Sequence, residues 1–310
     1  MRAAPASSGG VGAEQGIAPS LAELVALRGL AQGARPPRRG RLGVSGQGLS
    51  PLRGRGMEYA ESREYAIGDD ARHIDWRLTA RSGKPHTKLF QAERERLTLV
   101  IADTAPSLYF GTRVRFKSVQ AARAGAIAVW AAIRDGDRVA ALRGSHRDPP
   151  VPPAAGPRGA LRVLDALVRW YSAPPADDAG LVVAIEHARR LLRPGSRVVL
   201  IADPASVAAV PAERWPALSM HNEVIVLLLT DPLELDPPQA ALPFVTAAHR
   251  VELDLATAAQ RQRWKRTFVL PVDQACAQLP ARGVRVHRLS TDAPSQAWLP
   301  LLGRQGAVRA

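Results

Sequence analysis

From Leu97 onward, short runs of apolar residues alternate with segments whose apolar positions recur every three or four residues. Such runs are typical of buried strands, and the three-to-four spacing is typical of amphipathic helices. We therefore expect an α/β fold: a doubly wound, mainly parallel sheet with helices on both faces. Strands are expected at 97–102, 137–142, 197–202, 223–229 and 284–289, helices at 116–134, 158–171, 180–192 and partly 206–219, helical turns at 256–265 and 272–281, and a loop at 144–157.

The pattern before Leu97 is weaker. Ser20 is placed to cap a helix that ends near Leu30 and carries Leu21 on its apolar face. Residues 31–56 are rich in Gly, Arg and Pro, which predicts an irregular connector. We expect three parts: a flexible, basic arm with one short helix at 1–56, a small irregular or β segment at 57–96 packed on the main domain, and the α/β domain at 97–310.

Composition supports a folded protein and leaves the nature of its partner open. The chain has 310 residues, enough for a large core, and it is 46% hydrophobic, which excludes a wholly disordered chain. A formal net charge of +14 suggests an anionic partner. However, only four of the 42 basic residues are lysine, so we interpret the charge as an arginine-rich composition and expect nucleic acid not to be the partner. The arm at 1–56, with eight arginines and two glutamates, is the alternative docking surface for an anion.

The chain's only cysteine, Cys276, excludes an internal disulfide and a cysteine-rich zinc site. The first 16 residues lack the apolar centre of a signal peptide, and no apolar run approaches the roughly 20 residues of a spanning helix. We therefore expect a cytoplasmic protein without a transmembrane segment.

Three expected strands are each followed directly by an aspartate, namely Asp103, Asp203 and Asp231. The carboxyl ends of parallel strands meet at one edge of the sheet, where ligands bind at the point at which the strand order reverses. Carboxylates there could coordinate a hard divalent cation such as Mg²⁺. They could equally accept hydrogen bonds from the next turn or helix. Spacing alone leaves both interpretations open.

Residues 63–81 are the most distinctive segment of the chain. Turn-forming Gly68-Asp69-Asp70 is surrounded by arginines and carboxylates that could form a charged clasp. In this interpretation Ile74 and Trp76 insert into the main domain as anchors. The alternative is a surface that binds a partner protein. His73 and Asp75 could do acid–base chemistry, but no activated nucleophile or phosphate-binding loop accompanies them, so we do not expect an enzyme.

This segment and the run Asp103-Thr104-Ala105-Pro106-Ser107 resemble the family catalogued as domain of unknown function 58, a relative of the von Willebrand factor A domains. The resemblance extends from about Gly43 to Asp203 and includes Phe116-Lys117 and Gly136-Asp137-Arg138. It implies a von Willebrand A-like, Rossmann-type domain. It also implies a non-catalytic adaptor that acts with a MoxR-type AAA+ ATPase in the assembly or maturation of other proteins. The alternative is a metal-free scaffold that binds through the charged segment at 63–81. The signature residues to which this resemblance gives a binding or structural role are Arg63, Glu64, Tyr65, Gly68, Asp69, Asp70, Arg72, Asp75, Trp76 and Arg81.

The resemblance also implies a metal site, with Mg²⁺ as the candidate cofactor and Asp103, Ser107 and Asp203 as its ligands. The sequence departs from the pattern of that site at two positions. Ala105 replaces a serine, and Ala179-Gly180 stands where a threonine is expected. A methyl group donates no lone pair, so we expect a degenerate site. Thr104, Asp178 and Thr230 are the nearest polar residues that could compensate.

Overall fold

The structure is a computed structural model that describes residues 16–33, 57–66, 69–92, 96–245 and 250–303. The chain divides into two compact units. We call residues 39–95 the small unit, and residues 1–38 with 96–310 the large unit.

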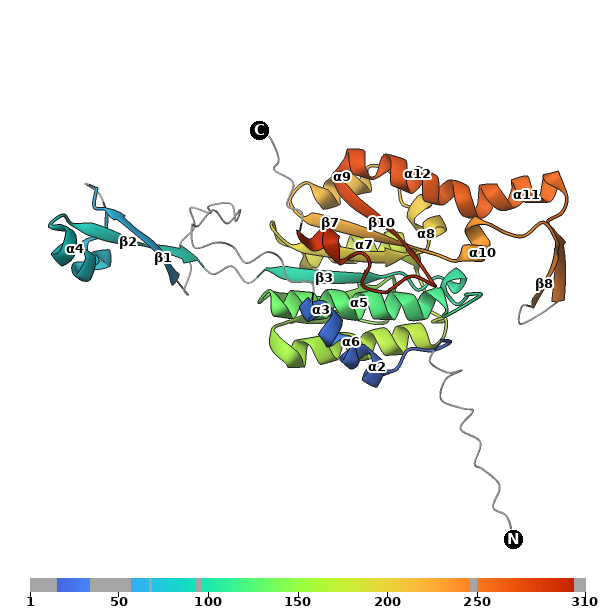
Figure 1. Cartoon of the computed structure of the whole chain (residues 1–310), viewed down its shortest axis with the longest axis horizontal. Helices are drawn as coiled ribbons and strands as arrows, with labels where there is room; N and C mark the ends of the chain where they lie inside the picture. Colours follow the sequence, from blue (N-terminus) through green and yellow to red (C-terminus); the bar gives the residue numbers. More distant parts are fainter. Residues whose placement is uncertain (1–15, 34–56, 67–68, 93–95, 246–249, 304–310) are drawn as a thin grey trace, which may run out of the picture. The chain divides into compact units, whose positions relative to one another are not determined.

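A six-stranded sheet forms the centre of the large unit (Figure 1). Its strand order is β10-β7-β6-β3-β4-β5, and every neighbouring pair is parallel except β4 and β5. β4 lies on one side of β3. β6, β7 and β10 follow in turn on the other side of β3. The strand order therefore reverses between β3 and β6. This reversal is the switch point of a doubly wound sheet. The strands are β3 (Leu97–Ala102), β4 (Arg138–Arg143), β5 (Val151–Ala154), β6 (Arg197–Ala202), β7 (Glu223–Thr230) and β10 (Val284–Ser290).

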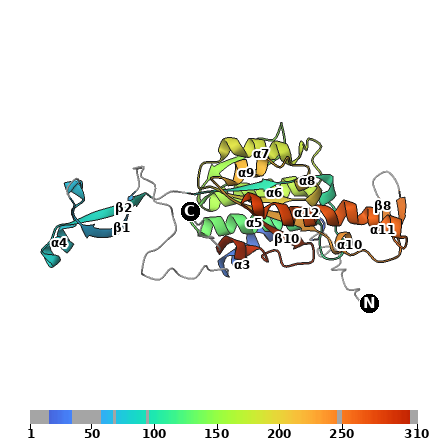
Figure 2. The same ribbon diagram turned by 90° about the horizontal axis from the view of Figure 1, so that it is seen from above.

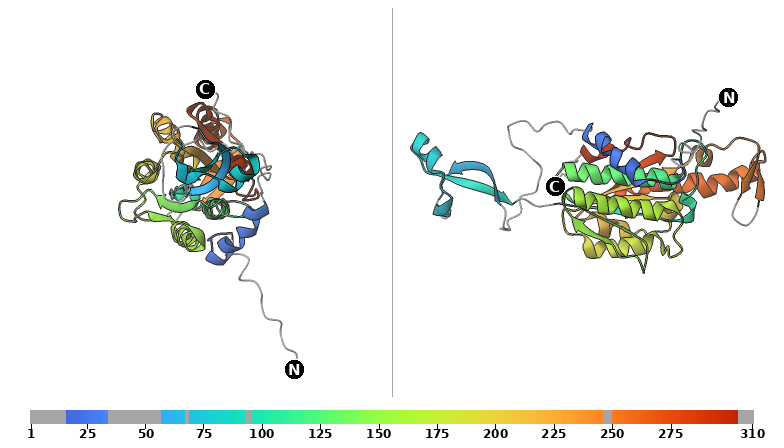
Figure 3. Two further views of the ribbon diagram at one scale, coloured as in Figure 1. Left: turned by 90° about the vertical axis from the view of Figure 1, so that its left-hand side faces the viewer. Right: turned by 90° about the horizontal axis from the view of Figure 1, so that it is seen from below.

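Helices cover both faces of this sheet (Figure 2). α5 (Lys117–Arg134) and α6 (Gly156–Ser172) lie side by side on one face, as the two green helices in Figure 3 show. α7 (Gly180–Leu191), α8 (Pro204–Ala208), α9 (Arg214–Ser219) and α12 (Leu270–Gln278) cover the other face. Strands β3, β6 and β7 are buried almost completely because side chains pack on both sides of them.

The expected strands and helices of the sheet are confirmed to within two residues, but the segment before Leu97 differs from the expectation. The single helix expected from Ser20 is two short helices, α2 (Leu21–Ala26) and α3 (Arg28–Gly33). Leu24 is fully buried, and α2 and α3 pack on α5. These helices therefore belong to the large unit; the rest of the expected arm, 1–15 and 34–56, lies outside the described residues.

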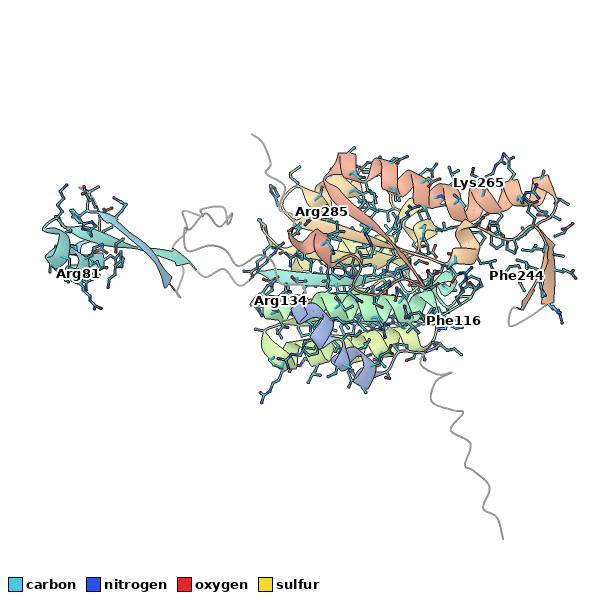
Figure 4. The ribbon with its side chains drawn as sticks, viewed as in Figure 1. Arg81, Phe116, Arg134, Phe244, Lys265 and Arg285 are labelled. Carbon is cyan, nitrogen blue, oxygen red and sulfur yellow. The ribbon has the colours of Figure 1, made fainter. Side chains whose placement is uncertain are left out.

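Two further regions differ from the expectation. β5 lies inside the expected loop at 144–157 and contains Pro152 and Pro153, which an edge strand tolerates because one of its sides needs no ladder hydrogen bonds. The two helical turns expected after 256 are instead one continuous helical segment, with a π-helical stretch at Lys265–Val269 between α11 (Ala258–Trp264) and α12. A hairpin of β8 (Ala241–Val245) and β9 (Arg250–Asp254) precedes it. Phe244 of this hairpin stacks on Trp264 of α11; Figure 4 labels Phe244 and Lys265.

The small unit is an antiparallel pair of strands with a helix between them in the sequence. β1 (Met57–Glu64) pairs with β2 (His86–Ala92). A 3-10 turn (Ala71–His73) and α4 (Trp76–Ser82) connect the two strands. No helix in the described part of the chain is both long and apolar enough to cross a membrane.

Candidate functional site

The switch point of the sheet brings two of the expected site residues together. Asp103 follows β3 and Asp203 follows β6, and these strands are neighbours. The backbone N–H of Asp203 donates to Oδ2 of Asp103 at 2.9 Å. Residues a hundred positions apart in the sequence therefore meet at the same edge, as the strand-end pattern predicts.

Burial dominates the electrostatics of Asp103. Its side chain is only 2% exposed. The backbone N–H groups of Asp203 and Ala105 donate to its carboxylate at 2.9 and 3.1 Å, and Ser206 adds a further hydrogen bond. Burial outweighs these donors and raises the pKa of Asp103 to about 6, because a desolvated carboxylate loses the stabilisation that water gives to its charge.

Asp203 is held by two donors of a different kind. Its Oδ1 accepts from the backbone N–H of Ala205 at 2.9 Å, which caps the N-terminus of α8. Its Oδ2 accepts from Nζ of Lys117 at 2.8 Å. Lys117 also donates to Oε1 of Glu234 at 2.6 Å. A buried ammonium, 1% exposed, therefore lies between two carboxylates.

Lys117 stays charged in this position. Burial alone lowers the pKa of a lysine, but the charges of Asp203 and Glu234 outweigh it and raise the pKa of Lys117 above its ordinary value. Lys117 is the first residue of α5, where the helix dipole disfavours a cation. The two carboxylates are therefore the interactions that stabilise the ammonium at this helix end; Figure 4 labels Phe116, the preceding residue, and Arg134 at the other end of α5.

Asp231, the third strand-end aspartate, follows β7 and holds Glu234 in position. Asp231 caps the short helix α10 (Pro232–Leu235), and its backbone N–H donates to Oε2 of Glu234 at 3.0 Å. The hydroxyls of Thr112 and Thr291 donate to the Asp231 carboxylate at 2.5 and 2.7 Å. Burial raises the pKa of Asp231, but these hydroxyls outweigh it and keep the pKa below its ordinary value. Asp231 therefore fixes Glu234 beside the lysine.

A threonine ligand was expected in the loop at Ala179-Gly180, but this loop is held by close backbone packing against Gly144. Gly180 begins α7 with a φ of +80°, a conformation that favours glycine. Gly144, after β4, lies so close that an added Cβ would come within 2.0 Å of the Gly180 carbonyl oxygen. Thr104 and Asp178, two of the residues that could compensate for the missing ligands, hydrogen-bond to each other at 2.9 Å.

The residues at the switch point do not fit a divalent cation as they are arranged. Asp203 already pairs with Lys117, and Asp103 accepts backbone and serine donors. Ser107 is exposed in a 3-10 turn (Pro106–Leu108), and Ala105 offers no side-chain ligand. No group of three or more His, Cys, Asp or Glu side chains arranged to hold a metal occurs among the residues that the structure describes. The Lys117 ammonium therefore supplies the positive charge beside Asp203 and Glu234.

The signature residues lie in the small unit, away in the sequence from the switch-point acids. Arg63 pairs with Asp69 at 2.6 Å, and Glu64 pairs with Lys84 at 3.2 Å. The hydroxyl of Tyr65 donates to the Asp69 carbonyl at 3.0 Å. Asp70 caps the 3-10 turn through the N–H of Arg72 at 3.0 Å, and Gly68 lies outside the described residues.

Asp75 has a structural role in this unit. Its carboxylate accepts from the backbone N–H of Leu78 at 3.1 Å and from the hydroxyl of Ser62 at 3.0 Å, so it caps α4. The donated hydrogen bond from Leu78 lowers the pKa of Asp75, which suits a helix cap and not a general base near neutral pH.

The expected charge clasp between this segment and the main domain stays a prediction, because the structure describes each unit by itself. Within residues 63–81, Arg63 has an acidic partner, whereas Arg72, Arg77 and Arg81 have none among the described residues. The expected insertion of Trp76 into the main domain stays a prediction. Within the small unit Trp76 is 71% exposed. The physical reason is the position of Trp76 at the first turn of α4, on the outward side of a helix whose partly buried residues are Leu78 and Thr79.

Lys117 and Glu234 are the site residues that the sequence interpretation missed. A signal for Lys117 exists: it is one of only four lysines and occupies a helix start, where a cation requires nearby acids. Glu234 gives a weaker signal as the fourth residue of an Asp-Pro-Leu-Glu capping box. Their pairing links positions 117 residues apart, which local patterns do not reveal.

The chain is 32% identical over 200 residues to "Uncharacterized protein Rv1480" of Mycobacterium tuberculosis and, at the same level, to "Uncharacterized protein Mb1516" of Mycobacterium bovis. The aligned part spans 63% of this chain and 62% of the length of these relatives. No solved structure matches the chain significantly. Residues 61–270 match the family described as "Protein of unknown function DUF58", and the chain therefore belongs to the DUF58 family.

Proposed function

We propose that this chain is a non-catalytic protein-interaction adaptor of the cytoplasm. The observation that supports the proposal most directly is the exposed Trp76 in the most distinctive segment of the chain. A solvent-exposed tryptophan beside arginines is typical of protein-binding surfaces, because both residue types are enriched at the centres of interfaces. The similarity of this family to proteins found with MoxR-type AAA+ ATPases supports such an ATPase as the partner, in the assembly or maturation of other proteins.

The switch-point acids fit a structural role better than a catalytic one. Asp203, Asp231 and Glu234 each accept from donors within the chain, and Lys117 is fixed by two of them. A catalytic acid or base needs a free side to reach its substrate. The chain's own groups occupy these sides, so the network stabilises the edge of the sheet and leaves binding to other surfaces.

A bridging Mg²⁺ held by Asp103, Ser107 and Asp203 is the other form of this proposal. It would attach the sheet edge to a carboxylate of the partner. Because Lys117 already pairs with Asp203, we favour an adaptor that needs no metal. Anion binding by the basic N-terminal arm stays a prediction, because most of that arm lies outside the described residues.

The test is a binding measurement with the MoxR-type AAA+ ATPase from the same genome, with and without Mg²⁺ and with a chelator. We expect binding that the chelator does not change. Absence of binding under all of these conditions contradicts the partnership. Binding lost on chelation contradicts the metal-free form. Turnover of a nucleotide or phosphoester by the purified chain, abolished by His73→Ala, contradicts the non-catalytic role.

A further inference from the structure

The outward side of α4 in the small unit is chemically distinctive. Trp76, Arg77, Ala80 and Arg81 are all exposed, whereas Leu78 and Thr79 are partly buried. Trp76 and Ala80 are one helical turn apart, as are Arg77 and Arg81, so the four side chains form one continuous surface. Figure 4 labels Arg81 on this helix. We call Trp76, Arg77, Ala80 and Arg81 the α4 face.

The arginines of the α4 face are available to a partner. Arg77 and Arg81 have no acidic partner among the described residues, in contrast to Arg63 and Lys84 of the same unit. The nearest acid in the sequence, Asp75, is engaged by Leu78 and Ser62 at the start of the helix. The α4 face therefore carries two arginines without an acidic partner in the described part of the chain, next to an exposed indole.

The helix that carries this face is rigidly held. Asp75 caps its first turn, and Gly83 ends it with a φ of +70° while its N–H donates to the Thr79 carbonyl at 2.9 Å. The Thr79 hydroxyl accepts from the backbone N–H of His86 in β2 at 3.0 Å, and the N–H of Asp75 donates to the His86 carbonyl at 2.8 Å. A surface fixed before binding loses little conformational entropy when a partner docks.

We propose that the α4 face binds an acidic polypeptide segment of a partner protein, with an apolar or aromatic residue against Trp76 and carboxylates paired with Arg77 and Arg81. This inference rests on the proposed adaptor function and specifies the chemistry of its partner. Guanidinium groups bind carboxylates through paired N–H donors, and an indole packs on apolar or aromatic side chains. Two charges on one short helix match a short acidic segment better than the long, regular phosphate backbone of a nucleic acid, which needs several cations along its length.

The experiment measures binding of the full chain to a random copolymer of glutamate and tyrosine, with a copolymer of lysine and tyrosine as the opposite-charge control. The variants are Trp76→Ala and the double change Arg77→Glu/Arg81→Glu. Met220→Ala is the matched apolar control, because Met220 is also 71% exposed. Arg158→Glu/Arg162→Glu is the matched charge control, because both arginines are exposed and have the same four-residue spacing on α6.

We expect the chain to bind the acidic copolymer and not the basic one. Trp76→Ala should weaken binding about 30-fold, the effect of removing a central interface tryptophan. The double arginine reversal should weaken it by more than about tenfold and reduce its salt dependence. The two controls should bind like the unchanged chain. Equal binding by all variants, or loss only in the α6 control, overturns the inference.

Competitors test the class of partner and separate this inference from the adaptor function. If single-stranded DNA or phosphatidylserine vesicles occupy the α4 face more tightly than the acidic copolymer, the polypeptide assignment is wrong. A dimer of the chain that Trp76→Ala dissociates also overturns it, since a second copy is then the occupant. If the ATPase binds the unchanged chain and all variants equally, the adaptor function stands and the α4 face is not its surface. If the ATPase does not bind but the copolymer binds through Trp76, the α4 face is a binding surface and the ATPase is not its partner.

Discussion

At the scale of a single residue, Lys117 compensates the charges of two buried carboxylates. Two carboxylates that come from β6 and α10 would repel each other in a dry environment. The ammonium between them removes this repulsion and satisfies two oxygens with hydrogen bonds of 2.8 and 2.6 Å. Removing one member of a buried charge network costs much more than an exposed ion pair is worth, because the remaining charges lose their partner.

We therefore expect Lys117→Met to lower the free energy of unfolding by about 3–5 kcal/mol. Urea denaturation measures this change. Lys265→Met is the control, because Lys265 is exposed, and it should change the free energy of unfolding by no more than about 0.5 kcal/mol. The melting temperature of the unchanged chain should not fall when EDTA is added, since the ammonium supplies the charge. A variant as stable as the unchanged chain, or a clear fall with EDTA, contradicts this interpretation of Lys117.

Asp103 makes the stability of the chain depend on pH in a defined direction. Its pKa of about 6 in the folded chain lies above the value of about 3.9 expected for an unfolded chain. The folded state therefore holds the proton more strongly, and the stabilisation that Asp103 contributes is complete below about pH 4 and is lost as pH rises through 6. Asp103→Asn removes this dependence.

The measurement is the difference in free energy of unfolding between the unchanged chain and Asp103→Asn. Between about pH 4.5 and about pH 7.5, the unchanged chain should lose about 2 kcal/mol of its free energy of unfolding relative to Asp103→Asn. A difference that stays constant, or that moves the other way, shows that Asp103 does not titrate as the buried carboxyl that the structure describes.

At the scale of secondary-structure elements, a second charge network holds the opposite edge of the sheet. Glu223 at the start of β7 pairs with Arg197 of β6 at 2.9 Å and also contacts Arg96 and Arg285. Burial lowers the pKa of Arg96 to about 10, so it remains charged at neutral pH. One carboxylate therefore links the starts of neighbouring strands; Figure 4 labels Arg285, on β10.

Replacing Glu223 with Gln should lower the free energy of unfolding by about 3 kcal/mol, because three partly buried guanidinium groups lose their shared carboxylate. The matched control is Glu186→Gln. Glu186 makes one pair with Arg214 at 2.8 Å, and both side chains are substantially exposed, so its loss should cost no more than about 1 kcal/mol. Equal effects in urea denaturation contradict the special role of Glu223.

Elements with a strong local pattern could be predicted from the sequence. The bounds of β3 and β6 agree with the prediction because each is a mainly apolar run that is followed directly by an aspartate. β5 could not be predicted, because its two prolines indicate a loop and only its pairing with β4 makes it a strand. The hairpin of β8 and β9 likewise depends on pairing and on the stacking of Phe244 on Trp264.

The candidate site likewise has a part that could be predicted from the sequence and a part that could not. The meeting of Asp103 and Asp203 could be predicted, because parallel strands place their carboxyl ends at one edge. The pairing of Asp203 with Lys117 could not, since it depends on how α5 packs against the sheet. The expected insertion of Trp76 into the main domain stays a prediction, and its exposure within the small unit depends on which side of α4 faces the strands of that unit.

For the whole molecule, the two units suggest different tasks. The large unit has an extensive core on both faces of its sheet and charge networks at both edges, features typical of a stable scaffold. The small unit carries an exposed helical face whose arginines have no acidic partner among the residues that the structure describes. This division is what we expect of an adaptor that presents a binding surface and needs neither a metal nor a catalytic group to do so.

The most direct test compares the affinity of three chains for the MoxR-type ATPase in the presence and absence of EDTA: the unchanged chain, Trp76→Ala and Ser107→Ala. Both altered residues are exposed, so neither change should unfold the protein. Our account predicts about 30-fold weaker binding for Trp76→Ala. It also predicts unchanged binding for Ser107→Ala, with or without EDTA. Normal binding by Trp76→Ala, together with loss of binding by Ser107→Ala or on addition of EDTA, would contradict the account and assign the partner to a metal at the edge of the sheet.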